Sequence, residues 1–269
     1  MWWLGPLEGN KYSDLGINLA VGAALGVAVL YVEALVGRSE AARERRFAEE
    51  RAFVQSLVAA TDLTEVNARG RSFAGILLSG RCVAGGDLSS TCLDRTDFRG
   101  ADLSRANLSG SRGEGLNLHG AQIDRLNARN VQWREANLAR ISGSDADFSD
   151  SNLANSTFTD ARIPRATLDH LEAHGADMRR ADLSDAKGDS PRFEGADFRA
   201  ASLRGARLEK PNFRDTDLRA VDLRDATLIE PDLRGADLRD ARVDGLDLQD
   251  PITDERTRLP EVLNRSGHA

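Results

Sequence analysis

The stretch PNFRDTDLRAVDLRDATLIEPDLRGADLRDA, residues 211–241, places a leucine or phenylalanine at every fifth position, starting at residue 213. An α-helix repeats its buried face every 3.6 residues and a β-strand every two, so neither produces this spacing. The same register continues without insertion or deletion from Leu63 to Leu248. Of its 38 positions, 32 hold Leu, Phe, Ile, Val, Met or Trp and the other six hold Ala or Gly. Internal repetition therefore decides the fold class.

Each five-residue unit also has a small inward position, two residues before the large one. Alanine dominates this second set, whereas the remaining three positions are mostly Asp, Asn, Arg, Ser, Thr and Gly. The pattern predicts that two side chains of each unit turn inward and three turn outward. A single unit cannot bury its apolar side chains alone, so the units are expected to coil and stack around a shared core.

The pattern A-(D/N)-L-x-x, as in ADLSRANLSG (101–110) and ADFRAASLRG (196–205), resembles the pentapeptide-repeat family over about 190 of the 269 residues. The resemblance implies an all-β solenoid, a right-handed quadrilateral parallel β-helix. Four units would form one coil of twenty residues, with about nine to ten coils in all. At about 4.8 Å between neighbouring strands, such a rod would be about 45 Å long.

The sequence contains its own test of a twenty-residue coil. Prolines recur at that spacing at residues 191, 211, 231 and 251. Small inward residues are also followed one coil later by bulky ones, as Gly113 is by Trp133, which would fill the space between coils. Where both inward residues are small (Ser111 with Gly113, Ala186 with Gly188), we expect a distorted corner or a thin spot in the core.

Two outward columns with the same spacing form a candidate interaction face. Four aspartates and four arginines flank the large inward residue in successive coils of the C-terminal half. We refer to them as the Asp–Arg columns, whose members are Asp177, Arg179, Asp197, Arg199, Asp217, Arg219, Asp237 and Arg239.

The segment before the repeats predicts a membrane anchor. Residues 15–32 form an 18-residue stretch without a charge, with aromatic residues near both ends, which favours a transmembrane helix over residues 15–36. A cleaved secretory signal and a peripheral segment are the alternatives. Lys11 stands alone before the span, whereas four arginines follow it at residues 38–46, so the rod is expected on the cytoplasmic side of a single-pass cell-membrane protein. Gly22 and Gly26 are spaced so that two anchors could pack together as a homodimer.

The remaining segments complete a five-part organisation. Residues 1–14 are a short N-terminal tail, 37–60 a charged juxtamembrane helix that would cap the first coil, 61–250 the repeats, and 251–269 a C-terminal cap. Caps are expected because the two ends of a β-helix are open sheet edges.

The residues that carry catalytic or metal chemistry are scarce. The sequence HLEAH (170–174) differs from the zinc-helix motif, and no phosphate-binding loop or nucleophile elbow occurs. Cys82 and Cys92 lie two units apart, on opposite sides of the expected coil, which disfavours a disulfide. We therefore predict no enzyme activity, no metal and no cofactor.

Three functions fit a filled rod. The first is a membrane-tethered scaffold that presents a rigid face to an unidentified protein partner. The second, implied by the family resemblance, is a DNA-imitating protein that occupies the DNA site of a type II topoisomerase, and the third is a passive spacer. Residues 61–250 contain 33 acidic and 27 basic side chains, which is too balanced to imitate a phosphate backbone well, and binding to nucleic acid itself is not expected.

Overall fold

The computed structural model describes residues 40–45, 47–49, 52–57, 59–60 and 62–265. The predicted tail (1–14), the predicted transmembrane helix (15–36) and the Gly22–Gly26 pair lie outside the described residues. Within the described ranges, none of the helices has both the length and the apolar character needed to cross a bilayer. The chain divides into two compact units, residues 1–53 and 54–269. In the first unit, residues 40–45, 47–49 and 52–53 are helical.

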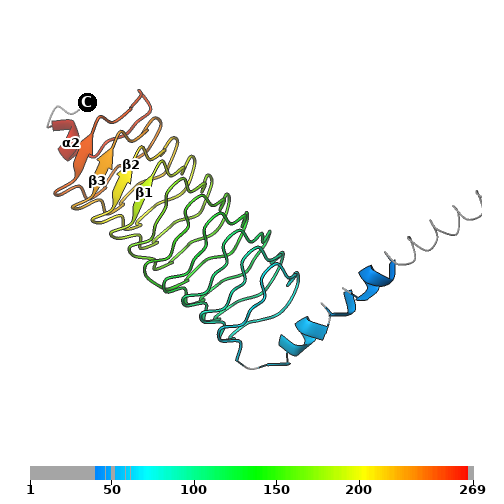
Figure 1. Cartoon of the computed structure of the whole chain (residues 1–269). Coiled ribbons are helices and arrows are strands. Elements are labelled where there is room, and N and C mark those ends of the chain that lie inside the picture. Colours follow the sequence, from blue (N-terminus) through cyan, green and yellow to red (C-terminus); the bar gives the residue numbers. More distant parts are fainter. Residues whose placement is uncertain (1–39, 46, 50–51, 58, 61, 266–269) are drawn as a thin grey trace, which may run out of the picture. The chain divides into compact units, whose positions relative to one another are not determined.

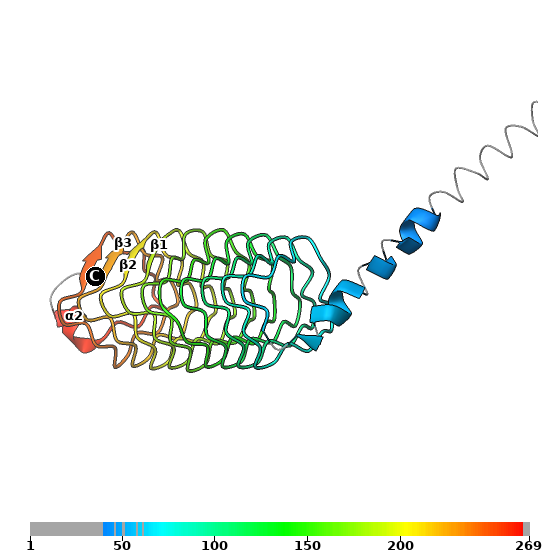
Figure 2. The same cartoon turned by 60° about the horizontal axis from the view of Figure 1, so that its bottom comes forward.

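The second unit is a parallel β-helix with twenty residues per coil (Figures 1 and 2). The residue before each large inward residue forms a parallel bridge with the residue twenty positions later, from Asp62 with Cys82 to Asp222 with Arg242. Backbone hydrogen bonds join the same neighbouring coils on either side of these bridges, as in the bond from the Leu63 amide to the Cys82 carbonyl (2.8 Å). This confirms the twenty-residue coil that the proline spacing predicted.

The inward residues form one continuous core along the rod. The large inward side chains from Leu63 to Leu238 are buried, none of them more than 5 % exposed. Alanines at the small inward position, such as Ala101 and Ala236, are fully buried between them. Phe193, Phe198 and Phe213 pack against one another, with ring centroids 5.1 to 5.9 Å apart.

The corners of the coil require a left-handed backbone conformation at every fifth residue. From Glu65 (φ 55°) to Asp250 (φ 46°), the residue two positions after each large inward residue has a positive φ. Most corners are closed by a turn hydrogen bond, such as the one from the Val66 amide to the Leu63 carbonyl (3.1 Å). A positive φ at the third residue of such a turn is the mark of a type II turn.

Four of the corners that lack this turn hydrogen bond carry the four strands of the described part of the chain. These are β1 (Lys187–Asp189), β2 (Arg207–Glu209), β3 (Thr227–Ile229) and β4 (Asp247–Gln249), paired in parallel in that order. Each strand is followed by one of the four regularly spaced prolines at residues 191, 211, 231 and 251. Proline has no N–H to close the turn, so the chain stays extended there. The distorted corner predicted at Ala186 and Gly188 is therefore shared by three later coils and follows from the prolines.

The thin spot predicted at Ser111 and Gly113 is filled from the next coil. The fully buried Trp133 donates a hydrogen bond from Nε1 to Ser111 Oγ at 3.0 Å. The nearby backbone bonds are long, at 3.3 Å from the Leu116 amide to Gly113 and 3.4 Å from the Gly115 amide to Arg134. The ring restores packing inside the rod, but the wall of the rod is loosened at this position.

The two ends of the second unit differ in how well they are covered. At the N-terminal end, residues 54–57 and 59 are helical and Leu57 is buried. At the other end, the parallel ladder continues into the predicted cap through Ile252 and, after one inserted residue, through Arg258. Helix α2 (Glu261–Arg265) follows, and the last inward residues, Val243 and Leu248, remain partly exposed.

Candidate interaction surfaces

The Asp–Arg columns lie on one face of the rod, where each coil contributes one matched pair. Residues two apart in an extended segment point to the same side, so the aspartate and arginine of one coil are neighbours. Arg179 Nη2 lies 2.6 Å from Asp177 Oδ2, and Arg219 Nη2 lies 2.6 Å from Asp217 Oδ2. The Nε atom of each of these two arginines also donates to the other carboxylate oxygen, at 2.8 and 2.9 Å.

Weaker contacts join neighbouring coils of the same face. Arg179 Nε lies 3.8 Å from Asp197 Oδ2, and Arg199 Nε lies 3.6 Å from Asp217 Oδ2. Six residues of the Asp–Arg columns, from Asp177 to Arg219, therefore form a ladder of alternating charges, and Asp237 pairs with Arg239 in the next coil. A partner binding here would meet side chains that are already ordered, so little side-chain entropy would be lost on binding.

The pKa values of these groups reflect the pairing. Hydrogen bonds from Arg219 hold the pKa of the Asp217 carboxyl below its usual value, and the same bonds raise the pKa of Arg219. Arg179 lowers the pKa of Asp177 in the same way, as Arg239 does for Asp237. The columns therefore stay charged at neutral pH while their opposite charges cancel at a distance.

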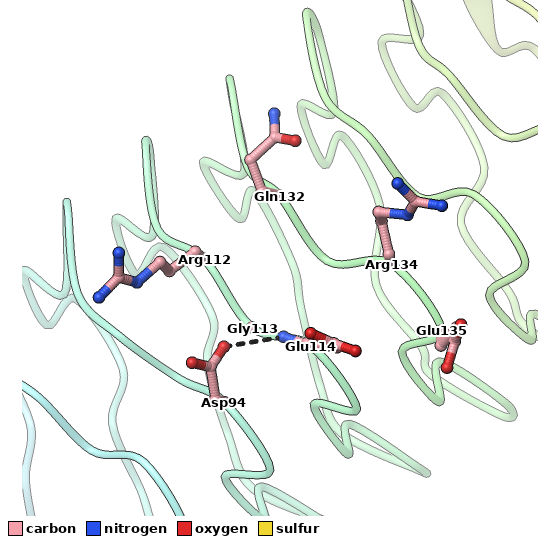
Figure 3. Close-up of a pocket in the computed structure, with 7 residues that line it drawn as sticks. All are labelled: Asp94, Arg112, Gly113, Glu114, Gln132, Arg134 and Glu135. Carbon is pink, nitrogen blue, oxygen red and sulfur yellow. Dashed lines mark hydrogen bonds between the residues drawn. The ribbon is translucent and has the colours of Figure 1, made fainter.

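A depression of about 430 Å³ lies over Gly113, on the face that carries Cys92, Arg112 and Gln132 (Figure 3). We call it the Gly113 depression. Its lining comes from three successive coils and consists of Asp94, Arg112, Gly113, Glu114, Gln132, Arg134 and Glu135. Asp94 Oδ1 accepts a hydrogen bond from the Glu114 amide at 3.0 Å. The repeat pattern indicates Gly113 through packing alone and does not reveal that its charged neighbours line a depression.

The other residues considered from the sequence do not come together as a site. Cys82 and Cys92 are free cysteines. Cys82 Sγ lies 3.3 Å from Thr64 Oγ1, and Cys92 donates to Asp94 Oδ2 at 3.2 Å. His170 occupies a left-handed corner, whereas His174 lies beyond the next inward residue in the adjoining unit. In the described part of the chain, no three His, Cys, Asp or Glu side chains are grouped as metal ligands would be.

The sequence matches the family described as Pentapeptide repeats in eight copies, over residues 91–126, 146–185, 192–228 and 212–250. No curated protein matches the chain.

Solved structures that resemble the chain include HetL, a pentapeptide repeat protein involved in heterocyst differentiation regulation from the cyanobacterium Nostoc sp. strain PCC 7120. It is 22 % identical, with 72 % of this chain and 90 % of HetL covered and a TM-score of 0.33. The full-length QnrB1, a plasmid-mediated fluoroquinolone resistance protein, is 17 % identical, with 77 % and 99 % covered and a TM-score of 0.35.

Proposed function

Because the chain belongs to the pentapeptide repeat family, we propose that it is a non-enzymatic scaffold, tethered to the membrane, whose rigid rod binds a protein partner. One observation supports this proposal above others: the interior is filled with apolar side chains, and the charged groups stand outside in fixed columns. An enzyme would need a concave pocket with converging groups. A rod with flat, ordered faces is suited to contact another macromolecule.

We propose the Asp–Arg columns as the contact face. In each coil, the side chains are held by ion pairs, and the side chains of Arg199 and Arg219 are still 44 % and 41 % exposed. A partner with the complementary alternation of charges could form further ion pairs without reorganising the rod. Charge complementarity of this kind contributes mainly to specificity and to the rate of association.

The test is proximity labelling in cells with the full-length chain and two matched double variants. Arg199→Glu with Arg219→Glu reverses charges in the Asp–Arg columns. Arg224→Glu with Arg234→Glu breaks the same kind of pair, with Asp222 and Asp232, on two other faces. We expect the first variant to lose a labelled partner that the second retains, while both melt within a few degrees of the unchanged chain.

Two results would overturn this proposal. If the first variant and its control label the same proteins as the unchanged chain, the Asp–Arg columns are not the contact face. If no labelled protein depends on any face, the rod is a passive spacer. A supercoiling assay with purified gyrase tests the DNA-imitating alternative, because such a protein would inhibit the enzyme without its membrane tether.

The tether needs a separate experiment, since it concerns residues 15–36. We expect the full-length chain to sediment with membranes and to resist alkaline extraction. In intact cells, the rod should be protected from external protease and become cleavable after the membrane is opened. Recovery in the soluble fraction would contradict the anchor, and cleavage in intact cells would contradict the cytoplasmic orientation.

A further inference from the structure

The Gly113 depression combines a local loss of packing with an unusual set of charges. The wall of the rod is loosened there, where two backbone hydrogen bonds reach 3.3 and 3.4 Å. A side chain could not easily replace Gly113, because a Cβ atom would lie 3.2 Å from Leu116 Cβ and 3.3 Å from Leu93 Cβ. Both contacts are with core side chains, so the interior beneath the depression is already filled.

The charged groups around the depression are sorted by sign. In Figure 3, Asp94, Glu114 and Glu135 lie along one side, and Arg112, Gln132 and Arg134 lie along the other. The acidic side takes one residue from each of three successive coils. On the other side, Gln132 and Arg134 belong to one coil, and Arg134 continues the column of Asp94 and Glu114, so the two rows run obliquely to the rod axis. One side offers carboxylate acceptors and the other offers guanidinium and amide donors.

The charges of the depression are not paired with each other, although the same motif is paired elsewhere. Arg192 and Glu194 occupy the same two columns four coils later, and there Nε and Oε1 lie 3.4 Å apart. Arg112 and Glu114 stand at the same spacing around Gly113 instead of Phe193. In the described part of the chain, no salt bridge of 4 Å or less involves either of them. The same holds for Arg134 and Glu135. A hydrogen bond to Cys92 and the charge of the nearby Asp94 raise the pKa of Arg112, but none of the four charged groups has an ion-pair partner within 4 Å among the described residues.

Charges of opposite sign on the two sides of a depression suit a ligand that has two sides. An extended peptide presents successive side chains to opposite sides, with a period of two residues. A peptide lying in the depression between the two rows would direct every second side chain to the acidic row and the others to the donor row. We infer that the Gly113 depression binds an extended segment of a partner protein in which basic and acidic residues alternate. This inference rests on the proposed function, because it assumes a protein partner.

The experiment measures binding of labelled hexapeptides with blocked ends to the full-length chain in detergent, by fluorescence polarisation. One peptide alternates lysine and glutamate. The second has the same composition in two blocks, three lysines followed by three glutamates, and the third is all lysine. We expect the alternating peptide to bind about tenfold more tightly than the blocked one, since only the former can satisfy both rows at once.

The variant Glu114→Gln with Glu135→Gln should weaken binding of the alternating peptide by about tenfold, as expected for two lost exposed charge contacts. Glu230→Gln, at an exposed corner outside the depression, is the control and should leave the affinity unchanged. Both variants should retain the melting temperature of the unchanged chain, because the altered side chains are exposed.

The inference is wrong if the blocked or all-lysine peptide binds as tightly as the alternating one, because attraction would then be unspecific. It is also wrong if the double variant binds all peptides as the unchanged chain does, or if no peptide binds. None of these outcomes affects the labelling experiment, which depends on the Asp–Arg columns and on proteins of the cell. If the labelling experiment also finds no partner that depends on the Asp–Arg columns, the proposed function is wrong as well.

Discussion

The coils up to residue 186 and the coils after it are built on the same inward pattern and differ in almost everything that faces outward. In the first region, most corners are closed by turn hydrogen bonds, and side-chain amides bond between coils, as Asn127 Nδ2 does to Asn107 Oδ1 (2.9 Å). In the second, four prolines hold one corner of each coil open, and aspartate–arginine pairs, fewer in the first region, occur on several faces of nearly every coil. Two different outward chemistries therefore stabilise one geometry.

This difference shows that the inward residues define the coil, whereas the outward residues are free to vary with function. The backbone step of twenty residues is the same in both regions. Changes to inward residues should therefore have large, local effects, because each coil of a solenoid contacts only its neighbours. Changes to outward residues should have small effects on stability and larger ones on recognition.

The largest effect on stability is expected for Trp133→Ala, which removes an inward side chain of the first region. It leaves a cavity under Gly113 and leaves the buried Ser111 hydroxyl without its Nε1 partner. We expect a loss of about 3–5 kcal/mol in the free energy of unfolding, measured by urea denaturation. Hydrogen exchange should increase near residues 111–136 and remain unchanged beyond residue 187. Trp133→Phe is the control and should lose much less, whereas uniform loss of protection along the rod would contradict independent coils.

A second pair of substitutions compares the two regions at an inward glycine of each, Gly143 and Gly188. A Cβ atom at Gly143 would lie 2.5 Å from the Asp124 amide nitrogen and the Ile123 carbonyl carbon, both backbone atoms. At Gly188, in the open corner of β1, the nearest backbone contact would be 3.0 Å. We expect Gly143→Ala to cost about 1–3 kcal/mol by overpacking, and Gly188→Ala to cost less. Equal thermal shifts for the two variants would contradict the greater tolerance of the proline corners.

The fold could be predicted from the sequence because its signal is repeated 38 times. The family and the parallel ladder with its twenty-residue step are confirmed, and the spacing of the four prolines already contained that step. The left-handed corners were missed, since residues such as Arg105, Ala200 and Asp225 occupy many of them and hide the preference for glycine. A glycine count at every fifth residue would have revealed them.

The surfaces were only partly predictable. The positions of the Asp–Arg columns follow from periodicity, but the ion pairs within each coil depend on side-chain geometry. The Gly113 depression depends on long backbone hydrogen bonds and on the directions of exposed side chains, which no repeat pattern encodes. Recognition by either surface stays a prediction.

A fall in pH should destabilise the two regions to different extents, because their outward side chains differ. Arginine hydrogen bonds lower the pKa of Asp217, Asp222 and Asp232 from the ordinary 3.8. Because the folded pKa lies below the unfolded one, these pairs stabilise the fold above pH 3.8, and this contribution is lost as the pH falls through the folded pKa values. Each pair should contribute only about 0.5 kcal/mol, since solvent screens groups this exposed.

Hydrogen exchange between pH 5 and pH 2.5, corrected for the intrinsic rate, measures this loss by region. We expect protection to fall earlier and further after residue 187 than around the amide ladder of residues 107–127. The first region also has such pairs, because arginines lower the pKa of Asp97, Asp160 and Asp177, and Arg165 lowers the pKa of Asp145 to about 2. Asp145→Asn should remove this local sensitivity, and simultaneous loss of protection everywhere would show that the pairs do not determine acid stability.

The smallest effect on stability is expected at one corner that occurs in every coil, where the first region has Gly100 and the second has Ala220. Gly100 has a φ of 63° with open space around its α-carbon, and six coils further Ala220 adopts a φ of 56°. A left-handed residue other than glycine costs about 1–2 kcal/mol, partly offset by the greater entropy of unfolded glycine. Gly100→Ala should therefore lower stability by about 0.5 kcal/mol, and Ala220→Gly should raise it by a similar amount. If both changes have the same sign in thermal unfolding, the corners of the two regions differ in backbone strain as well as in outward chemistry.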